Sequence, residues 1–354
     1  MPTSPLMKFT PRWGEFHAFE RYHCEKSAHR GRIFHRVDVG IDPYEGIPYP
    51  NAKSQFEHNT MRNNKRVFAL GFFDGVHLGH QALLRECRAL AQKLNCGTAA
   101  ITFDRHPQSL FSATPPALIS TAGSRRLLLR SYGIGYIHEY PVIREVMSMH
   151  WRDFLQELLD LGAVGFVCGD DFRFGSRGEG NADKLRDLCA ELDLPCVIVP
   201  EQTVDGIRIS STHIRSLIEG GKMETAVKFL GHPHVISGTV VHGKSLGRTL
   251  GIPTANLVLE PGLVVPKFGV YACRCIVDGK SYPAVTNVGT RPTVNGVGVT
   301  VEPWILDFEG DLYDREITLE FNRFLRPETK FDSLSALQTQ IRKDAEETRV
   351  YFEK

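Results

Sequence analysis

The stretch GFFDGVHLGH, residues 71–80, decides how the first half of this 354-residue chain folds. The apolar run 66–70 precedes it, and residues 83–94 after it carry apolar side chains at helical spacings of three and four. The stretch itself has too many turn formers for a strand and too many glycines for a helix. We therefore predict a strand, a glycine-rich turn and a helix start, which together point free backbone N–H groups at an anion.

Two histidines in this stretch indicate the chemistry of the turn. His77 and His80 are three residues apart and lie on the same side of the first helical turn, and Gly79 leaves room for a phosphate. Two imidazole donors beside a phosphorus can stabilise the charge that develops in a transition state. The alternative is a polar turn with two solvated histidines. A zinc site is disfavoured because no third and fourth ligand stands at usable spacing.

A second candidate anion site is ISSTHIR, residues 209–215, which follows an apolar strand and opens a helix. Ser211 and Thr212 place hydroxyls at the helix start, and Arg215 follows one turn later. Taken alone, the hydroxyls are an ordinary N-cap. At the same sheet edge as residues 71–80, they would bind the far end of a triphosphate.

Strand-like and helical patterns alternate from residue 66 to about residue 200. The predicted strands are 66–70, 98–103, 134–139, 163–168 and 195–200. The helices between them include 123–131, one that carries Trp151, Phe154, Leu155, Leu158 and Leu159, and 182–192. Such alternation predicts a mostly parallel, doubly wound sheet of the α/β class. Ligands of these sheets bind at the carboxyl ends of the strands, where residues 71–80 stand.

After Gly231 the pattern changes to antiparallel β structure. Strand-like segments at 234–242, 269–277, 281–286, 299–308 and 315–321 predict a small closed barrel. Asp332 or Ser333 then caps a terminal helix. We therefore divide the chain into an extension (1–60), an α/β domain (61–220), a linker (221–232) and a β-barrel domain (233–354), with helices at 210–219 and 222–230 joining the domains.

Composition limits the class of protein. The formal net charge of +1 does not indicate a nucleic-acid partner or an acidic membrane, and no apolar run reaches the length of about 18 residues that a membrane span needs. The eight cysteines form no CxxC pair, which favours free thiols in the cytoplasm. Residues 1–60 contain too few apolar side chains to build a core, so we expect a poorly ordered, dispensable extension. No feature of the sequence indicates an oligomeric state.

Residues 238–245, GTVVHGKS, match the Walker A pattern of phosphate-binding loops. A P-loop must lead into a helix, whereas Gly247, Gly251 and Pro253 follow here. We therefore reject a P-loop.

Three motifs carry a family resemblance. GFFDGVHLGH, CGDDFRFG (168–175) and ISSTHIR closely resemble the FMN adenylyltransferase module of bacterial bifunctional riboflavin kinase/FAD synthetases, a Rossmann-like nucleotidyltransferase with an HxGH signature. The resemblance implies that His77 and His80 contact ATP phosphates in the transition state. It further implies binding of ATP or its phosphates by Gly71, Asp74, Gly79, Ser211, Thr212 and Arg215, and flavin contacts by Asp171 and Phe172.

The second half resembles the riboflavin kinase module of the same family. GKSLGRTLGIPTANL (243–257) is similar to its glycine-rich loop and PTAN signature, and NVGTRPT (287–293) and VEPWILDFEGDLY (301–313) follow in the family's order. The resemblance implies phosphate binding by Gly243, Gly247, Arg248, Thr254 and Asn256, with Thr254 and Asn256 also holding Mg²⁺. Glu302 matches the base that accepts the proton of the riboflavin hydroxyl.

Three residues depart from the family's pattern: Phe72, Arg105 and Asp314. The resemblance nevertheless predicts an enzyme that phosphorylates riboflavin to FMN and adenylylates FMN to FAD, with ATP as substrate and Mg²⁺ in both steps. Two alternatives are a nucleotidyltransferase for another acceptor with an accessory barrel, and a non-catalytic flavin-binding protein. The intact PTAN signature and Glu302 argue against the first alternative, and the presence of His77, His80 and Glu302 argues against the second.

Overall fold

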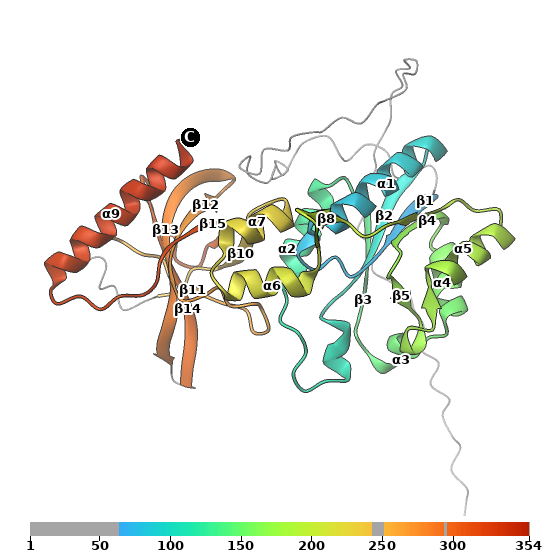
Figure 1. Cartoon of the computed structure of the whole chain (residues 1–354), viewed down its shortest axis with the longest axis horizontal. Helices are drawn as coiled ribbons and strands as arrows, with labels where there is room; N and C mark the ends of the chain where they lie inside the picture. The colour runs from blue at the N-terminus through green and yellow to red at the C-terminus, as the bar shows by residue number, and fades with distance from the viewer. Residues whose placement is uncertain (1–63, 243–250, 294–295, 354) are drawn as a thin grey trace, which may run out of the picture.

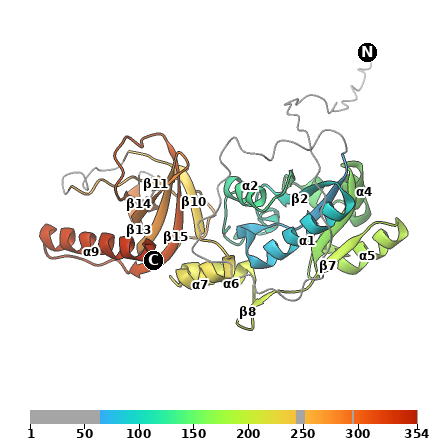
Figure 2. The same cartoon turned by 90° about the horizontal axis from the view of Figure 1, so that it is seen from above.

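A computed structural model describes residues 64–242, 251–293 and 296–353. The predicted extension 1–60 and three residues of the glycine-rich loop, Gly243, Gly247 and Arg248, lie outside the described residues. The described chain forms an α/β domain and a β barrel, with helices α6 (Ser211–Glu219) and α7 (Met223–Leu230) between them in both views (Figures 1 and 2).

The α/β domain is built on a five-stranded parallel sheet, as predicted. Its order is β3-β2-β1-β4-β7. The strands are β1 (Arg66–Leu70), β2 (Gly97–Phe103), β3 (Tyr136–Tyr140), β4 (Ala163–Gly169) and β7 (Cys196–Val199). The strand order reverses between β1 and β4, so the carboxyl ends of these two strands form the switch point at which such sheets bind ligands.

Helices cover both faces of this sheet, which confirms the doubly wound prediction. Alternate residues of β1 point to opposite faces: Val67 packs with α1 (Leu78–Leu94) and α2 (Ala122–Ser131). Phe68 packs on the other face with α4 (Trp151–Asp160) and α5 (Ala182–Glu191). Among the described helices, none is long and apolar enough to cross a membrane.

The second domain is an antiparallel barrel of six strands in the order β10-β15-β12-β13-β14-β11. They are β10 (His234–Thr239), β11 (Leu257–Val258), β12 (Gly269–Val277), β13 (Lys280–Thr293), β14 (Gly296–Ile305) and β15 (Glu316–Arg326). A bridge between Val240 and Leu257 joins the two edges and nearly closes the barrel, as predicted. Ser333, rather than Asp332, caps the terminal helix α9 (Leu334–Phe352) because its Oγ accepts the N–H of Ala336 at 3.1 Å.

A single apolar core spans the junction of the domains. Ile214 of α6 and Phe229 of α7 pack with Tyr271 of the barrel and with Ile119 of the α/β domain. The segment 221–232, which we predicted as a linker, therefore contains a packed helix. We keep the boundaries near residues 220 and 233 as a proposal.

Several short elements were not predicted from the sequence. They are the 3₁₀ turns Asp74–Val76, Pro107–Leu110 and Ser176–Gly178, helix α3 (Arg144–Met147), strand β11 and the hairpins β5 (Arg173–Phe174)–β6 (Gly180–Asn181) and β8 (Thr203–Val204)–β9 (Ile207–Arg208). Strand β13 runs well beyond the predicted 281–286, because Gly289 and Pro292 disguise its second half as a loop. In the Walker-like region, β10 ends at Thr239 and the described residues 251–256 contain no helix.

Candidate active sites

The turn after β1 is held in an unusual backbone conformation. Phe73, Gly75 and Val76 all have positive φ angles, of 58°, 75° and 40°. Phe73 and Val76 lack glycine's freedom, so packing must hold them there, which is typical of functional sites. Gly75 cannot be replaced easily, because a Cβ would lie 2.7 Å from Cγ2 of Ile119. The turn thus holds the start of α1 in a fixed position at the switch point of the sheet.

The two histidines stack on each other at this helix start. Their ring centroids are 3.6 Å apart with an interplanar angle of 12°. His77 caps α1, and its Nδ1 accepts the backbone N–H of His80 at 3.3 Å. Burial lowers the pKa of His77 to about 3 and that of His80 well below its usual value. Both rings are therefore neutral at physiological pH and can act as N–H donors without adding charge.

The second cluster reaches the same turn through an ion pair. Arg215 of α6 contacts the buried carboxylate of Asp74 at 2.9 Å. Asp74 also accepts the backbone N–H groups of Ile119 and Ser120, at 2.9 and 3.1 Å. Donors of the protein surround the Asp74 carboxylate, which holds Arg215 against the turn. The binding of ATP by Asp74 stays a prediction.

The remaining residues predicted for this site lie at its edge. Ser211 donates to the Asp74 carbonyl at 3.4 Å, whereas Thr212 is exposed. Gly71 directly follows β1, and Gly79 faces the His77 ring, whose Nδ1 would be 3.2 Å from a Cβ placed on that glycine. These contacts bring the 71–80 stretch and the 209–215 stretch together.

The predicted flavin residues follow β4, the strand next to β1. Phe172 stacks on Phe174 with ring centroids 5.6 Å apart, and the exposed Asp171 pairs with Arg208 at 2.6 Å. Arg208 was not singled out from the sequence, because it comes from the β8–β9 hairpin, which has no motif. Both departures nearby are accommodated: Phe72 packs edge-on against His106, and Arg105 is exposed beside Asp104.

The barrel brings its predicted residues together on neighbouring strands. Leu257 pairs with Val301, and the Ala255 N–H donates to the Pro303 carbonyl at 2.9 Å, so Asn256 lies opposite Glu302. Directly opposed residues of paired strands project on the same face. Glu302 is half-buried, and Asn287 lies opposite it on its other side.

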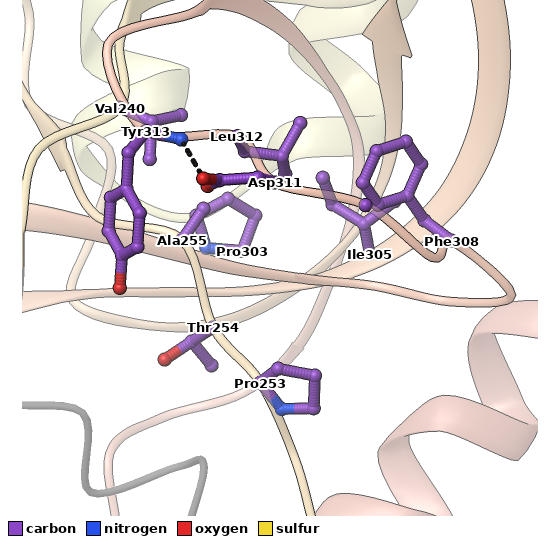
Figure 3. Close-up of a pocket in the computed structure, with 11 residues that line it drawn as sticks. Val240, Pro253, Thr254, Ala255, Pro303, Ile305, Phe308, Asp311, Leu312 and Tyr313 are labelled. Carbon is purple, nitrogen blue, oxygen red and sulfur yellow. Dashed lines mark hydrogen bonds between the residues drawn. The ribbon is translucent and has the colours of Figure 1, made fainter.

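A pocket opens beside these strands (Figure 3). Thr254 lines it together with Pro253, Val240 and the loop of Asp311 and Tyr313. The Tyr313 ring stacks on His242 with centroids 3.8 Å apart, and its backbone N–H donates to Asp311 at 3.0 Å. The departure at Asp314 is a left-handed turn residue with φ of 59°, a conformation that Asp tolerates.

Comparisons with known proteins match the two parts of the chain to two enzyme families. Family models match an FAD synthetase over residues 59–213 and a riboflavin kinase over residues 230–352. The bifunctional riboflavin kinase/FMN adenylyltransferase of Listeria monocytogenes is 34% identical and covers 82% of this chain and 93% of its own length. The protein of that description from Pseudomonas fluorescens is 37% identical, covering 82% of this chain and 95% of its own.

A solved structure shares the whole arrangement. It is described as a macrolide-efflux protein from Streptococcus pneumoniae, and it matches with a TM-score of 0.74 at 32% identity, over 82% of this chain and 95% of that one. The efflux description concerns that protein alone.

The fold and the matches define a flavin-nucleotide enzyme in which a nucleotidyltransferase-type domain precedes a riboflavin kinase barrel. The chain belongs to the family of bifunctional riboflavin kinases/FMN adenylyltransferases. It phosphorylates riboflavin to FMN and then adenylylates FMN to FAD, with ATP as the second substrate of each step.

Proposed function

We propose that the two reactions occur at two separate sites, and that the carboxyl end of β1 carries adenylyl transfer. The observation that supports this most is the turn at the sheet's switch point, where His77 caps α1 and Asp74 pairs with Arg215. His77 and His80 donate N–H groups to the ATP phosphates as charge develops on them. Asp171 and Phe172, just after β4, contact the flavin of FMN.

The adenylyl step needs no nucleophile from the protein. An oxygen of the FMN phosphate forms a bond to the α-phosphorus of ATP. The bond from that phosphorus to the bridging oxygen of the β-phosphate breaks, and its electron pair leaves with pyrophosphate. The residues named act by positioning and by stabilising charge. Ser211, Thr212 and Arg215 hold the phosphates that leave.

We propose that the barrel transfers the γ-phosphoryl group. The terminal hydroxyl oxygen of the riboflavin side chain bonds to the γ-phosphorus, and the bond to the bridging oxygen breaks as ADP leaves. The Glu302 carboxylate accepts the hydroxyl proton. The strand register that places Asn256 opposite Glu302 supports this assignment.

Mg²⁺ fits the donors present in the barrel. Thr254 and Asn256 carry hard, uncharged oxygens, and Mg²⁺ commonly combines a few protein oxygens with water and substrate phosphates. No group of three or more His, Cys, Asp or Glu able to hold a metal occurs in the described parts of the chain. The proposed Mg²⁺ site therefore combines protein oxygens with oxygens of water and of the substrate phosphates. When bound, the ion would neutralise charge on the transferred phosphoryl group.

Two further assignments are proposals of the same kind. A net charge of +1 supports small molecules, rather than nucleic acid or a membrane, as the binding partners. The seven cysteines of the described residues are all free thiols, which supports the reducing cytoplasm as the location.

Two pairs of substitutions test the assignment of sites. His77→Ala should lower the turnover of supplied FMN to FAD on the order of 10²-fold and leave riboflavin phosphorylation intact. His150→Ala is its control, because His150 also caps a helix, α4, by accepting a backbone N–H at Nδ1, but it is exposed and lies far from the turn in sequence. Chromatography of the flavins measures both steps.

Glu302→Gln should do the reverse, with FMN formation reduced on the order of 10²-fold or more and adenylylation of supplied FMN unchanged. Glu316→Gln, on the exposed start of β15, is the matched control. The assignment fails if either test variant, in folded protein, depresses both steps equally.

A further inference from the structure

Arg125 of α2 has the largest side chain that is completely buried in the described part of the chain. One Nη atom donates to the Phe103 carbonyl, and the guanidinium lies over the Phe72 ring, 4.7 Å from its centroid. Its Nε and other Nη atoms are buried and have no hydrogen-bond partner among the described residues. A buried guanidinium with two unused donors is uncommon, because unmet polar groups are costly inside a protein.

The charge of Arg125 is also unmet. Burial lowers the pKa of the guanidinium, but an arginine starts so high that it stays protonated. Three carboxylates lie near Arg125, and each is paired with another arginine: Asp74 with Arg215, Glu139 with Arg126, and Asp104 with Arg105. No ion pair of Arg125 occurs in the described structure. With both histidines neutral, the group made by Asp74, Arg215 and Arg125 carries one net positive charge.

This unpaired cation stands at the adenylyl-transfer site. Phe72, beneath the guanidinium, belongs to the 71–80 turn, and Phe103 ends β2 beside the carboxyl end of β1. The pKa of His80 is lowered by burial first, and then by the nearby His77 and Arg125. His80 Nδ1 is itself buried without a partner among the described residues. Two nitrogens of Arg125 and one of His80 are therefore buried and unused at the same end of the sheet.

We propose that Arg125 is a phosphate-binding residue of the adenylyl-transfer site, an assignment that rests on the proposed function of that site. Its ligand is a phosphate group, either of the ATP polyphosphate or of FMN. Phosphate supplies the negative charge that the buried cluster lacks and accepts the two unused N–H donors in the fork geometry of a guanidinium. Phosphate binding there requires the half-buried Phe72 ring, which covers the guanidinium, to move aside.

Three substitutions separate charge from packing. Arg125→Lys keeps the charge, Arg125→Gln keeps a donor for the Phe103 carbonyl without the charge, and Arg125→Met removes both. Arg126→Met is the matched control, because Arg126 is the next residue of α2 but is exposed and paired with Glu139 at 3.0 Å. Each full-length variant is assayed for kcat and for KM toward ATP and FMN, and riboflavin phosphorylation reports on the rest of the chain.

We expect adenylylation to follow the charge. Arg125→Gln and Arg125→Met should both lose kcat/KM on the order of 10²-fold, whereas Arg125→Lys should retain far more and Arg126→Met should match wild type. If Arg125→Gln has a raised KM for ATP, and pyrophosphate no longer raises its melting temperature, the ligand is the polyphosphate of ATP. A raised KM for FMN alone assigns it to the FMN phosphate. Either result supports the proposal.

Other outcomes overturn it. If Arg125→Gln and Arg125→Lys are equally active and only Arg125→Met is impaired, the side chain serves packing alone. Wild-type kinetics in folded Arg125→Gln would equally exclude a phosphate contact. If Arg125→Met does not fold, the activities of Arg125→Gln and Arg125→Lys still show whether adenylylation depends on the positive charge. A wild-type enzyme that fails to adenylylate FMN, or a fully active His77→Ala, would instead refute the site on which the proposal rests.

Discussion

At the scale of single residues, buried histidines make this protein sensitive to acid. Burial lowers the pKa values of His77 and His234 to about 3, and it also lowers that of His232. The folded state therefore binds fewer protons than the unfolded chain, whose histidines titrate near 6.5. Their contribution to the free energy of unfolding is complete above about pH 6.5 and is lost as the pH falls toward about 3.

His234→Phe tests this account where catalysis is not involved. His234 is buried at the start of β10, packs against Phe321, and has no hydrogen-bond partner for either ring nitrogen among the described residues. Phenylalanine keeps the ring and removes the unmet polar atoms, so the barrel should gain about 1 to 3 kcal/mol of stability. Urea unfolding at about pH 8 and about pH 5 should show a larger gain at the lower pH. A variant less stable than wild type at both would contradict it.

At the scale of elements, the apolar periodicity predicted every long helix and the parallel strands, because each long element buries one continuous face. It did not predict the left-handed residues of the turn or the contacts of residues 230–232, since these depend on close approach between distant segments. Gly231 ends α7 with φ of 74°, and a Cβ there would lie 2.4 Å from Leu78 Cδ2 at the start of α1. His232 then places its Nε2 2.9 Å from the Gly75 carbonyl.

These contacts indicate that the domain junction positions the adenylyl-transfer turn. Gln81 Nε2 donates to the carbonyls of Val76 and Leu230, at 2.9 and 2.7 Å, and so ties the turn to the end of α7. Gln81→Leu should lower the rate of FMN adenylylation roughly 3- to 30-fold, because two hydrogen bonds of about 1 kcal/mol each are lost. Riboflavin phosphorylation should not change. Gln92→Leu, exposed on the same helix, is the control; equal effects of the two on adenylylation would refute a positioning role.

At the scale of the whole molecule, the chain joins two nucleotide-using domains through a shared core around α6 and α7. The order of the motifs predicted both domains. It could not predict that Asp74 faces Arg215, or that Arg125 is buried without an ion pair among the described residues, because neither follows from spacing along the chain. The packing of α7 onto the barrel likewise depends on surfaces that no local pattern encodes.

The central claim is that each domain holds a complete site, and mixing two damaged enzymes tests it most directly. Full-length His77→Ala and Glu302→Gln are incubated with riboflavin, ATP and Mg²⁺, first separately and then together. Alone, His77→Ala should accumulate FMN, and Glu302→Gln should leave riboflavin unconverted. Together they should form FAD after a lag, because FMN released by one protein is the substrate of the other. A mixture in which both variants are folded, yet neither FMN nor FAD forms, would contradict two independent sites.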